Sequence, residues 1–185
     1  MQLRPNRLAL LGLFALALLS RLVVASEEGS PSEYQVEAAF LYHFAQFVIW
    51  PSEVFATTNA PLKVGFVGDD PVCGAFETAV TGKTVNGHPF QILRLDPRSP
   101  AECRPCQIVF IAPMERKRLG DILAPLKGAS ILTVSRTEHF TESGGMVNFI
   151  LEQKKVRFEI NDVAARAVGL KVSAKLLNLA RRKDL

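Results

Sequence analysis

The chain has 185 residues, of which 48% are apolar, and its formal net charge is +4. This length suggests one domain, and this apolar content argues against a disordered chain. Arg4, Arg7 and Arg21 lie within the first 25 residues, which hold no acidic residue, so the remainder carries only +1. A nucleic-acid-binding protein needs a dense set of Lys and Arg side chains, and the weak charge argues against that function.

The first 25 residues have the pattern of a cleaved secretory signal peptide. Arg4 and Arg7 form a positive start, and residues 8–19 form an apolar run of 12 residues. Residues 23–25 then offer small or β-branched side chains for cleavage after Ala25. Because 12 apolar residues are too few to span a membrane comfortably, we expect export rather than anchoring. The expected organisation is a signal peptide at residues 1–25 and one domain at residues 26–185, with no membrane insertion of the mature chain; an uncleaved anchor is the alternative.

Residues 32–51 predict a helix with a defined start and end. Ser32 and Gln35 fit a capping box, in which two side chains satisfy the first free amides of a helix. Pro51 cannot continue a helix, so the helix should end near Ile49.

This helix is apolar on nearly all sides, because Gln35, His43 and Gln46 fall in one narrow strip and apolar residues cover most of the rest. A helix of this kind must be covered on more than one side. It is either a core helix within one domain or a helix with one side at an interface with a second copy or a partner. The candidate interface residues are Phe40, Tyr42, Phe44, Phe47 and Trp50.

Strands and helices alternate along the rest of the chain. The stretches expected to be strands are residues 62–67, 90–95, 107–112, 131–134, 146–151 and 156–160. The expected helices are residues 74–80, 115–126, 162–168 and 172–182, and residues 86–87 form an Asn-Gly turn. This alternation, with mostly continuous apolar strands, predicts a single three-layer α/β domain. We expect a mostly parallel, Rossmann-like sheet with helices on both faces and an antiparallel hairpin at its edge.

Three cysteines, Cys73, Cys103 and Cys106, remain in the expected mature chain. In an oxidising compartment one pair should be bridged and one thiol left over. Residues 103–106 also have the Cys-x-Pro-Cys spacing of thiol–disulfide exchange enzymes. Those enzymes place the first Cys at a helix N-terminus, whereas this motif leads into an expected strand.

Candidate ligand residues lie near two expected strands. Asp69 and Asp70 follow the first strand, where α/β proteins usually bind ligands, and a solvated turn is the alternative. Gly144 and Gly145 offer bare backbone to a ligand, and tight backbone geometry is the alternative. The sequence contains no Gly-x-Ser-x-Gly elbow, and we nominate no catalytic residue, metal ligand or cofactor.

Several stretches resemble the YfiR-like family over residues 34–180. These are the apolar helix of residues 34–51, the Val-Gly-Asp-Asp-Pro of residues 67–71, the stretch of residues 131–149, and residues 156–180. The last of these, beginning Val-Arg-Phe-Glu-Ile-Asn, is the most specific.

The resemblance implies a periplasmic α/β protein without known catalysis. It implies that the chain binds the periplasmic part of an inner-membrane signalling protein, a diguanylate cyclase or a sensor kinase, and represses it. Repression of a cyclase would lower cyclic di-GMP and biofilm formation. The resemblance also implies a homodimer and a Cys73–Cys106 disulfide, with Cys73–Cys103 as the alternative pairing.

Two other functions remain open. A small-molecule-binding protein would use the strand ends near Asp69, Asp70, Gly144 and Gly145. A thiol oxidoreductase would use the motif of residues 103–106.

Overall fold

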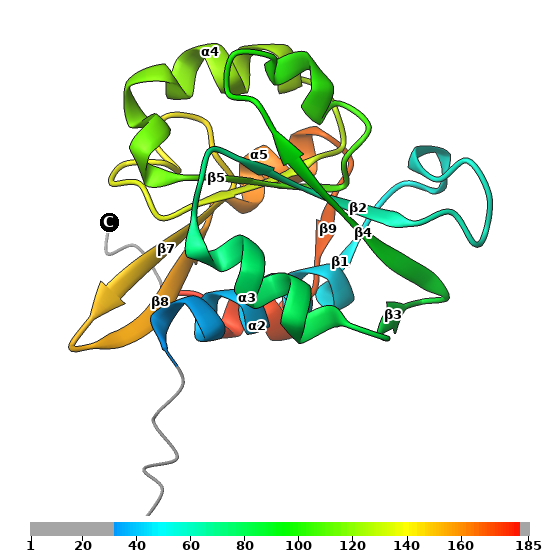
Figure 1. The fold of residues 1–185 in the computed structure, drawn as a ribbon, viewed down its shortest axis with the longest axis horizontal. Coiled ribbons are helices and arrows are strands. Elements are labelled where there is room, and N and C mark those ends of the chain that lie inside the picture. Colours follow the sequence, from blue (N-terminus) through cyan, green and yellow to red (C-terminus); the bar gives the residue numbers. More distant parts are fainter. Residues whose placement is uncertain (1–31, 182–185) are drawn as a thin grey trace, which may run out of the picture. The chain divides into compact units, whose positions relative to one another are not determined.

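The computed structural model describes residues 32–181, so the predicted signal peptide of residues 1–25 lies outside the described residues. The described chain is a mixed α/β protein with a seven-stranded sheet of order β3-β4-β2-β5-β6-β7-β8 (Figure 1). The strands are β2 (Leu62–Val67), β3 (Thr84–Val85), β4 (His88–Leu95), β5 (Ile108–Ile111), β6 (Leu132–Ser135), β7 (Val147–Glu152) and β8 (Lys155–Ile160).

Five neighbouring strands of this sheet, β4, β2, β5, β6 and β7, run parallel. The short β3 and the edge strand β8 run antiparallel to their neighbours. The mixed α/β class, the mostly parallel sheet and the edge hairpin are therefore confirmed, whereas the Rossmann-like description stays a prediction. The strand order reverses between β2 and β5, and such a reversal leaves a crevice at the carboxyl ends of the strands.

Both faces of the sheet are buried, because successive side chains of a strand point to opposite sides. In β5, Ile108 and Phe110 belong to one apolar cluster, and Val109 and Ile111 belong to a second. The first cluster includes residues of α2 (Glu33–Phe47), α3 (Pro71–Val80) and α6 (Ala174–Leu179). The second includes residues of α4 (Leu119–Leu123), on the other side of the sheet (Figure 1). This double burial explains why the strands are continuously apolar.

The predicted first helix is confirmed at its start and is shorter at its end. Ser32 Oγ accepts a hydrogen bond from Gln35 N at 3.3 Å, and Gln35 Oε1 accepts one from Ser32 N at 2.8 Å. The helix ends at Phe47, because the next two residues form β1 (Val48–Ile49), which pairs with β9 (Lys171–Val172).

Other helix boundaries differ from the predicted ones for local reasons. α3 begins three residues earlier than predicted, because Asp70 Oδ1 accepts from Val72 N at 3.0 Å and so caps the helix. The predicted helix of residues 115–126 is divided, since Pro113 and Pro125 each lie in a 3-10 helix beside the short α4. The remaining elements are the 3-10 helices η1 (Ser52–Val54), η2 (Pro100–Cys103), η3 (Pro113–Arg118) and η4 (Ala124–Leu126), and the helix α5 (Asp162–Ala167).

Candidate functional site

The predicted interface residues, four in α2 and Trp50 just after β1, are covered mainly by their own chain. Phe44 is fully buried, and Trp50 is buried with its Nε1 donating to Gln107 O at 3.1 Å. The interface prediction is therefore wrong for these two residues. The physical reason is that α2 packs against α3, α6 and β8, so its own domain covers more than one side of the helix.

Phe40, Tyr42 and Phe47 are half-buried and pack against the first cluster. Lys83 Nζ lies over the ring of Tyr42, 4.9 Å from its centroid, and Lys175 Nζ lies over the ring of Phe47 at 5.1 Å. The three aromatic side chains keep part of their surface accessible beside positive charge. Their role in an interface stays a prediction.

All three cysteine thiols are free and buried in this structure. Cys103 and Cys106 belong to the second cluster, and Cys106 N donates to Cys103 O at 3.0 Å in a tight turn. Cys73 belongs to the first cluster, on the other face of the sheet. The sheet lies between Cys73 and the other two cysteines, whereas a disulfide needs close Cα atoms and converging Cβ atoms. This pairing stays a prediction that the geometry does not favour.

Burial also disfavours thiol catalysis at residues 103–106. Loss of contact with water raises the pKa of Cys103 to about 12 and the pKa of Cys106 to about 11. Catalytic thiols need accessible positions and lowered pKa values, so that the thiolate forms near neutral pH. The thiol oxidoreductase is therefore the weakest of the three functions considered.

The structure separates the two pairs of candidate ligand residues. Asp69 and Asp70 follow β2 at its carboxyl end, whereas Gly144 and Gly145 precede β7, at the opposite end of the parallel strands. A Cβ atom at Gly145 would clash with the ring of Phe140, so close packing accounts for this glycine. The four residues do not form one site.

Asp70 instead joins two residues that the sequence analysis did not single out. Arg136 follows β6 and donates from Nη2 to Asp70 Oδ2 at 2.6 Å and from Nη1 to Glu37 Oε2 at 2.9 Å. The ring of Tyr34 covers the guanidinium group, with its centroid 4.8 Å from Cζ. Both carboxylate side chains are 5% exposed. Residues from α2, the cap of α3 and the end of β6 thus meet in one charged cluster.

The sequence holds a weak signal for this cluster. Glu37 is a charged residue within an otherwise apolar stretch of α2, and charged residues are almost never fully buried unless they are paired. Nothing in the sequence identifies its partner, because Arg136 lies 99 positions away.

The carboxyl group of Glu37 titrates near neutral pH. Burial raises its pKa to about 7, because the loss of water outweighs the favourable charge of Arg136. A carboxyl group with such a perturbed pKa beside a pocket is a candidate functional group.

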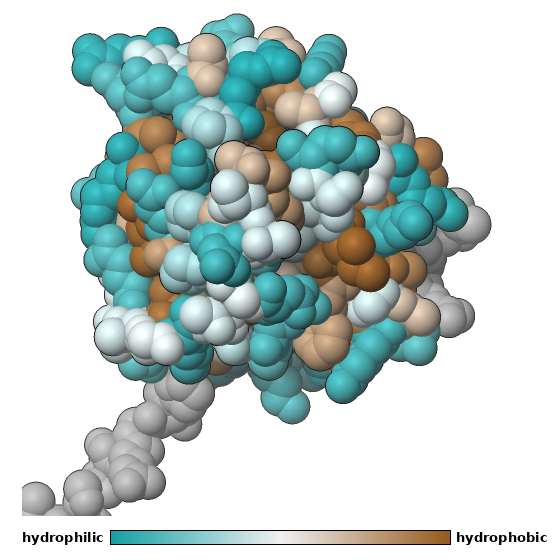
Figure 2. All heavy atoms as spheres, turned by 90° about the vertical axis from the view of Figure 1, so that its right-hand side faces the viewer, coloured by the Kyte–Doolittle hydropathy of each residue, from teal (hydrophilic) through white to brown (hydrophobic). Residues whose placement is uncertain are grey.

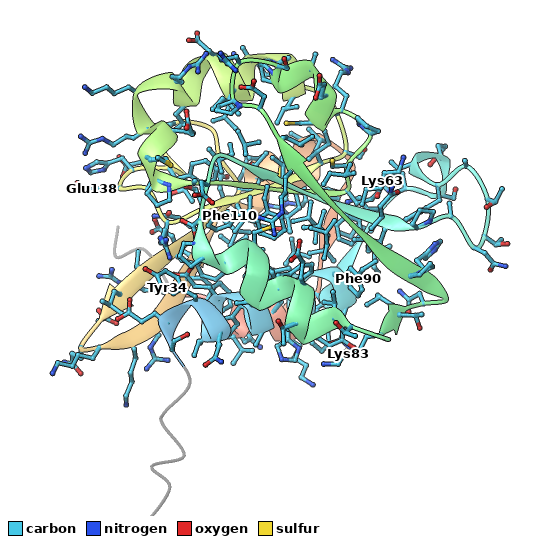
Figure 3. All side chains as sticks on the ribbon, in the orientation of Figure 1. Tyr34, Lys63, Lys83, Phe90, Phe110 and Glu138 are labelled. Carbon is cyan, nitrogen blue, oxygen red and sulfur yellow. The ribbon has the colours of Figure 1, made fainter. Side chains whose placement is uncertain are left out.

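A pocket of about 360 Å³ opens beside this cluster. It lies where Pro113 and Arg136 follow the carboxyl ends of β5 and β6, the edge at which open α/β sheets bind ligands. Figure 3 shows Tyr34 at the start of α2, close to the β7–β8 hairpin. The lining residues are Glu33, Tyr34, Glu37, Pro113, Arg136, Phe149, Ile150, Leu151 and Val156.

Two further properties apply to residues 32–181. Within this range, no group of three or more His, Cys, Asp or Glu residues is arranged to hold a metal ion. No helix in the same range combines the length and the apolar character needed to cross a membrane.

The comparisons with known proteins identify a family. A family model described as DUF4154, YfiR/HmsC-like, matches residues 34–181. A comparison with curated proteins found no match. The matched range includes all seven strands of the sheet, and it includes α2 and the lining of the pocket except for Glu33. The chain therefore belongs to the YfiR/HmsC-like family.

Proposed function

We propose that this protein is a non-enzymatic periplasmic regulator that binds a membrane signalling protein and represses it. The family match over residues 34–181 carries this proposal. The partner is a diguanylate cyclase or a sensor kinase of the inner membrane, and the protein binds its periplasmic part. Repression of a cyclase would lower cyclic di-GMP and biofilm formation.

The surface of α2 supplies the proposed docking residues. Phe40, Tyr42 and Phe47 are partly exposed, and Ile49, just beyond the helix, is 63% exposed. Large apolar and aromatic side chains at a surface are typical of protein interfaces. Figure 2 views the molecule from the right-hand side of Figure 1, and on this face patches of apolar residues lie among polar ones.

The proposal includes two structural properties. The domain is a three-layer Rossmann-like fold, supported by its parallel strands and by the reversal of strand order between β2 and β5. The protein is a homodimer, and we expect light scattering of the purified protein to give twice the mass of one chain. A mass equal to one chain across the micromolar range would contradict the dimer.

Affinity capture tests the proposed partner. The tagged protein should be expressed in its native envelope and recovered from detergent-solubilised inner membranes, with bound proteins identified by mass spectrometry. We expect a transmembrane protein that carries a cyclase or a kinase domain. Tyr42→Asp and Phe47→Asp should reduce this recovery, while Glu53→Gln, in η1, should leave it unchanged. Recovery of the tagged protein alone would contradict the proposal.

A further inference from the structure

The pocket beside Glu37 combines two kinds of lining. Glu33, Glu37 and Arg136 supply charged groups, and the apolar residues are Pro113, Phe149, Ile150, Leu151 and Val156. A volume of about 360 Å³ suits a small molecule. This lining fits a ligand with one charged end and one apolar end.

The charged end of such a ligand is not an anion, because Arg136 is already engaged. Its Nη1 and Nη2 donate to Glu37 and Asp70, and the ring of Tyr34 covers its guanidinium face. Glu33, Glu37 and Asp70 together carry more negative charge than Arg136 neutralises. The electrostatic potential of the pocket therefore favours a cation.

Glu37 has an oxygen available for such a cation. Its Oε2 accepts from Arg136, whereas its Oε1 accepts no hydrogen bond within residues 32–181. Among the side-chain nitrogen and oxygen atoms of the same residues, Asn148 Oδ1 is the only one that is both sealed from solvent and unpaired. Oε1, which is unpaired in this range, therefore keeps contact with solvent, and Glu37 lines the pocket. The side chain of Glu37 is 5% exposed, and within the described residues only one of its two carboxylate oxygens accepts a hydrogen bond. Such a carboxylate is a strong acceptor for an ammonium group.

We propose that this pocket binds a small amphipathic amine. Its ammonium group donates to Oε1 of Glu37, with Glu33 adding negative charge nearby. Its apolar body packs against Leu151 and the neighbouring apolar residues of the β7–β8 hairpin. This site does not depend on the proposed repressor function, and binding of an amine and binding of a membrane partner can be tested separately.

The pocket also gives amine binding a defined pH dependence. The charged groups around Glu37 are Glu33 on the same helix, Asp70 at the start of α3 and Arg136 after β6. Because burial raises the pKa of Glu37 to about 7, the free pocket loses an acceptor charge as the pH falls below this value. An ammonium ion stabilises the carboxylate and lowers its pKa in the complex. Affinity should therefore fall by up to about tenfold per pH unit below 7.

Isothermal titration calorimetry of the purified protein with 2-phenylethylamine tests the proposal. At pH 8 we expect saturable binding of this amine, and no binding of 3-phenylpropanoate, an anion of similar size. Glu37→Gln keeps the shape of the side chain and an oxygen for Arg136, and it should weaken amine binding by at least about tenfold. Glu53→Gln, which removes a carboxylate outside the pocket, should not change the affinity.

A second variant keeps the test decisive if Glu37→Gln does not fold. Leu151 is 57% exposed, so Leu151→Ser should fold normally and bind the amine severalfold more weakly. Three results would overturn the proposal: absence of saturable binding up to about 10 mM amine, equal binding of the anion, or unchanged affinity in the folded variants.

Discussion

Arg136 neutralises two carboxylates that are almost completely withdrawn from water. Its partners lie 99 and 66 positions away in the chain, so these contacts form only in the folded state. A buried ion pair adds little net stability, because desolvation offsets the attraction between the charges. Removal of one partner lowers the free energy of unfolding considerably, because it leaves an uncompensated charge in the interior.

The variant Arg136→Met should lose about 3 kcal/mol of unfolding free energy at pH 8, measured by urea denaturation. The reason is that Glu37 and Asp70 would remain buried without a cation. The matched control is Arg98→Met, because Arg98 pairs with Asp96 in a largely exposed position. This control should leave the stability nearly unchanged, because water screens an exposed pair of charges. Equal losses in the two variants would contradict a special role for Arg136.

Glu37 should make the protein less stable as the pH rises from 5 to 8. Its pKa is raised from 4.5 to about 7 in the folded state, so the folded protein holds this proton more tightly than the unfolded chain. The resulting stability is present below pH 4.5 and is lost as the pH rises through 7. The loss attributable to this group is up to about 3 kcal/mol.

Denaturation of the protein and of Glu37→Gln at pH 5 and pH 8 measures this contribution. The variant cannot ionise at position 37, so its stability should fall less over the same interval. Parallel curves for the two proteins would show that Glu37 does not titrate in this range.

At the residue scale, the sequence predicts only part of the charged cluster. Asp70 could be nominated because it follows a strand in a turn-forming stretch. Glu37 gives only a weak signal, as a charged residue in an apolar stretch, and nothing in the sequence pairs it with Arg136. The sequence shows which residues are polar, but it does not show which distant polar residues neutralise each other.

At the element scale, α2 shows how far an apolar pattern can be interpreted. The predicted polar strip of Gln35, His43 and Gln46 is exposed, so the periodicity correctly identified the solvent-facing side of the helix. The pattern also required cover on more than one side, and the structure provides it from α3, α6 and β8. The pattern could not tell whether this cover comes from the same chain, and Phe44 and Trp50 proved to be core residues.

The cysteines provide an element-scale prediction, because two faces of the sheet separate them. A tight turn brings Cys103 and Cys106 together, so peptide mapping without reduction should find these two joined and Cys73 free. This bridge closes a loop of about 4 residues and should contribute about 2 kcal/mol, compared with about 4 kcal/mol for a loop of about 34 residues from Cys73 to Cys106. A peptide joining Cys73 to Cys106 would instead support the pairing that the family resemblance implies.

At the scale of the whole molecule, the class of fold was predictable and the site was not. Continuous apolar strands between helices indicated a mostly parallel sheet, because such strands are buried on both faces. Strand order was not accessible, because it depends on crossovers whose direction the sequence does not record. The pocket lies at the carboxyl edge, where Pro113 and Arg136 follow β5 and β6, whereas Gly144 and Gly145 precede β7 at the other edge.

The central claim is that this family member represses a membrane signalling protein by binding it. The most direct measurement is the catalytic rate of the captured partner, as cyclic di-GMP formation or autophosphorylation, at increasing concentrations of the purified protein. We predict a saturable fall in this rate, over the same concentrations at which the two proteins bind. A rate that stays constant when binding is complete would contradict the account.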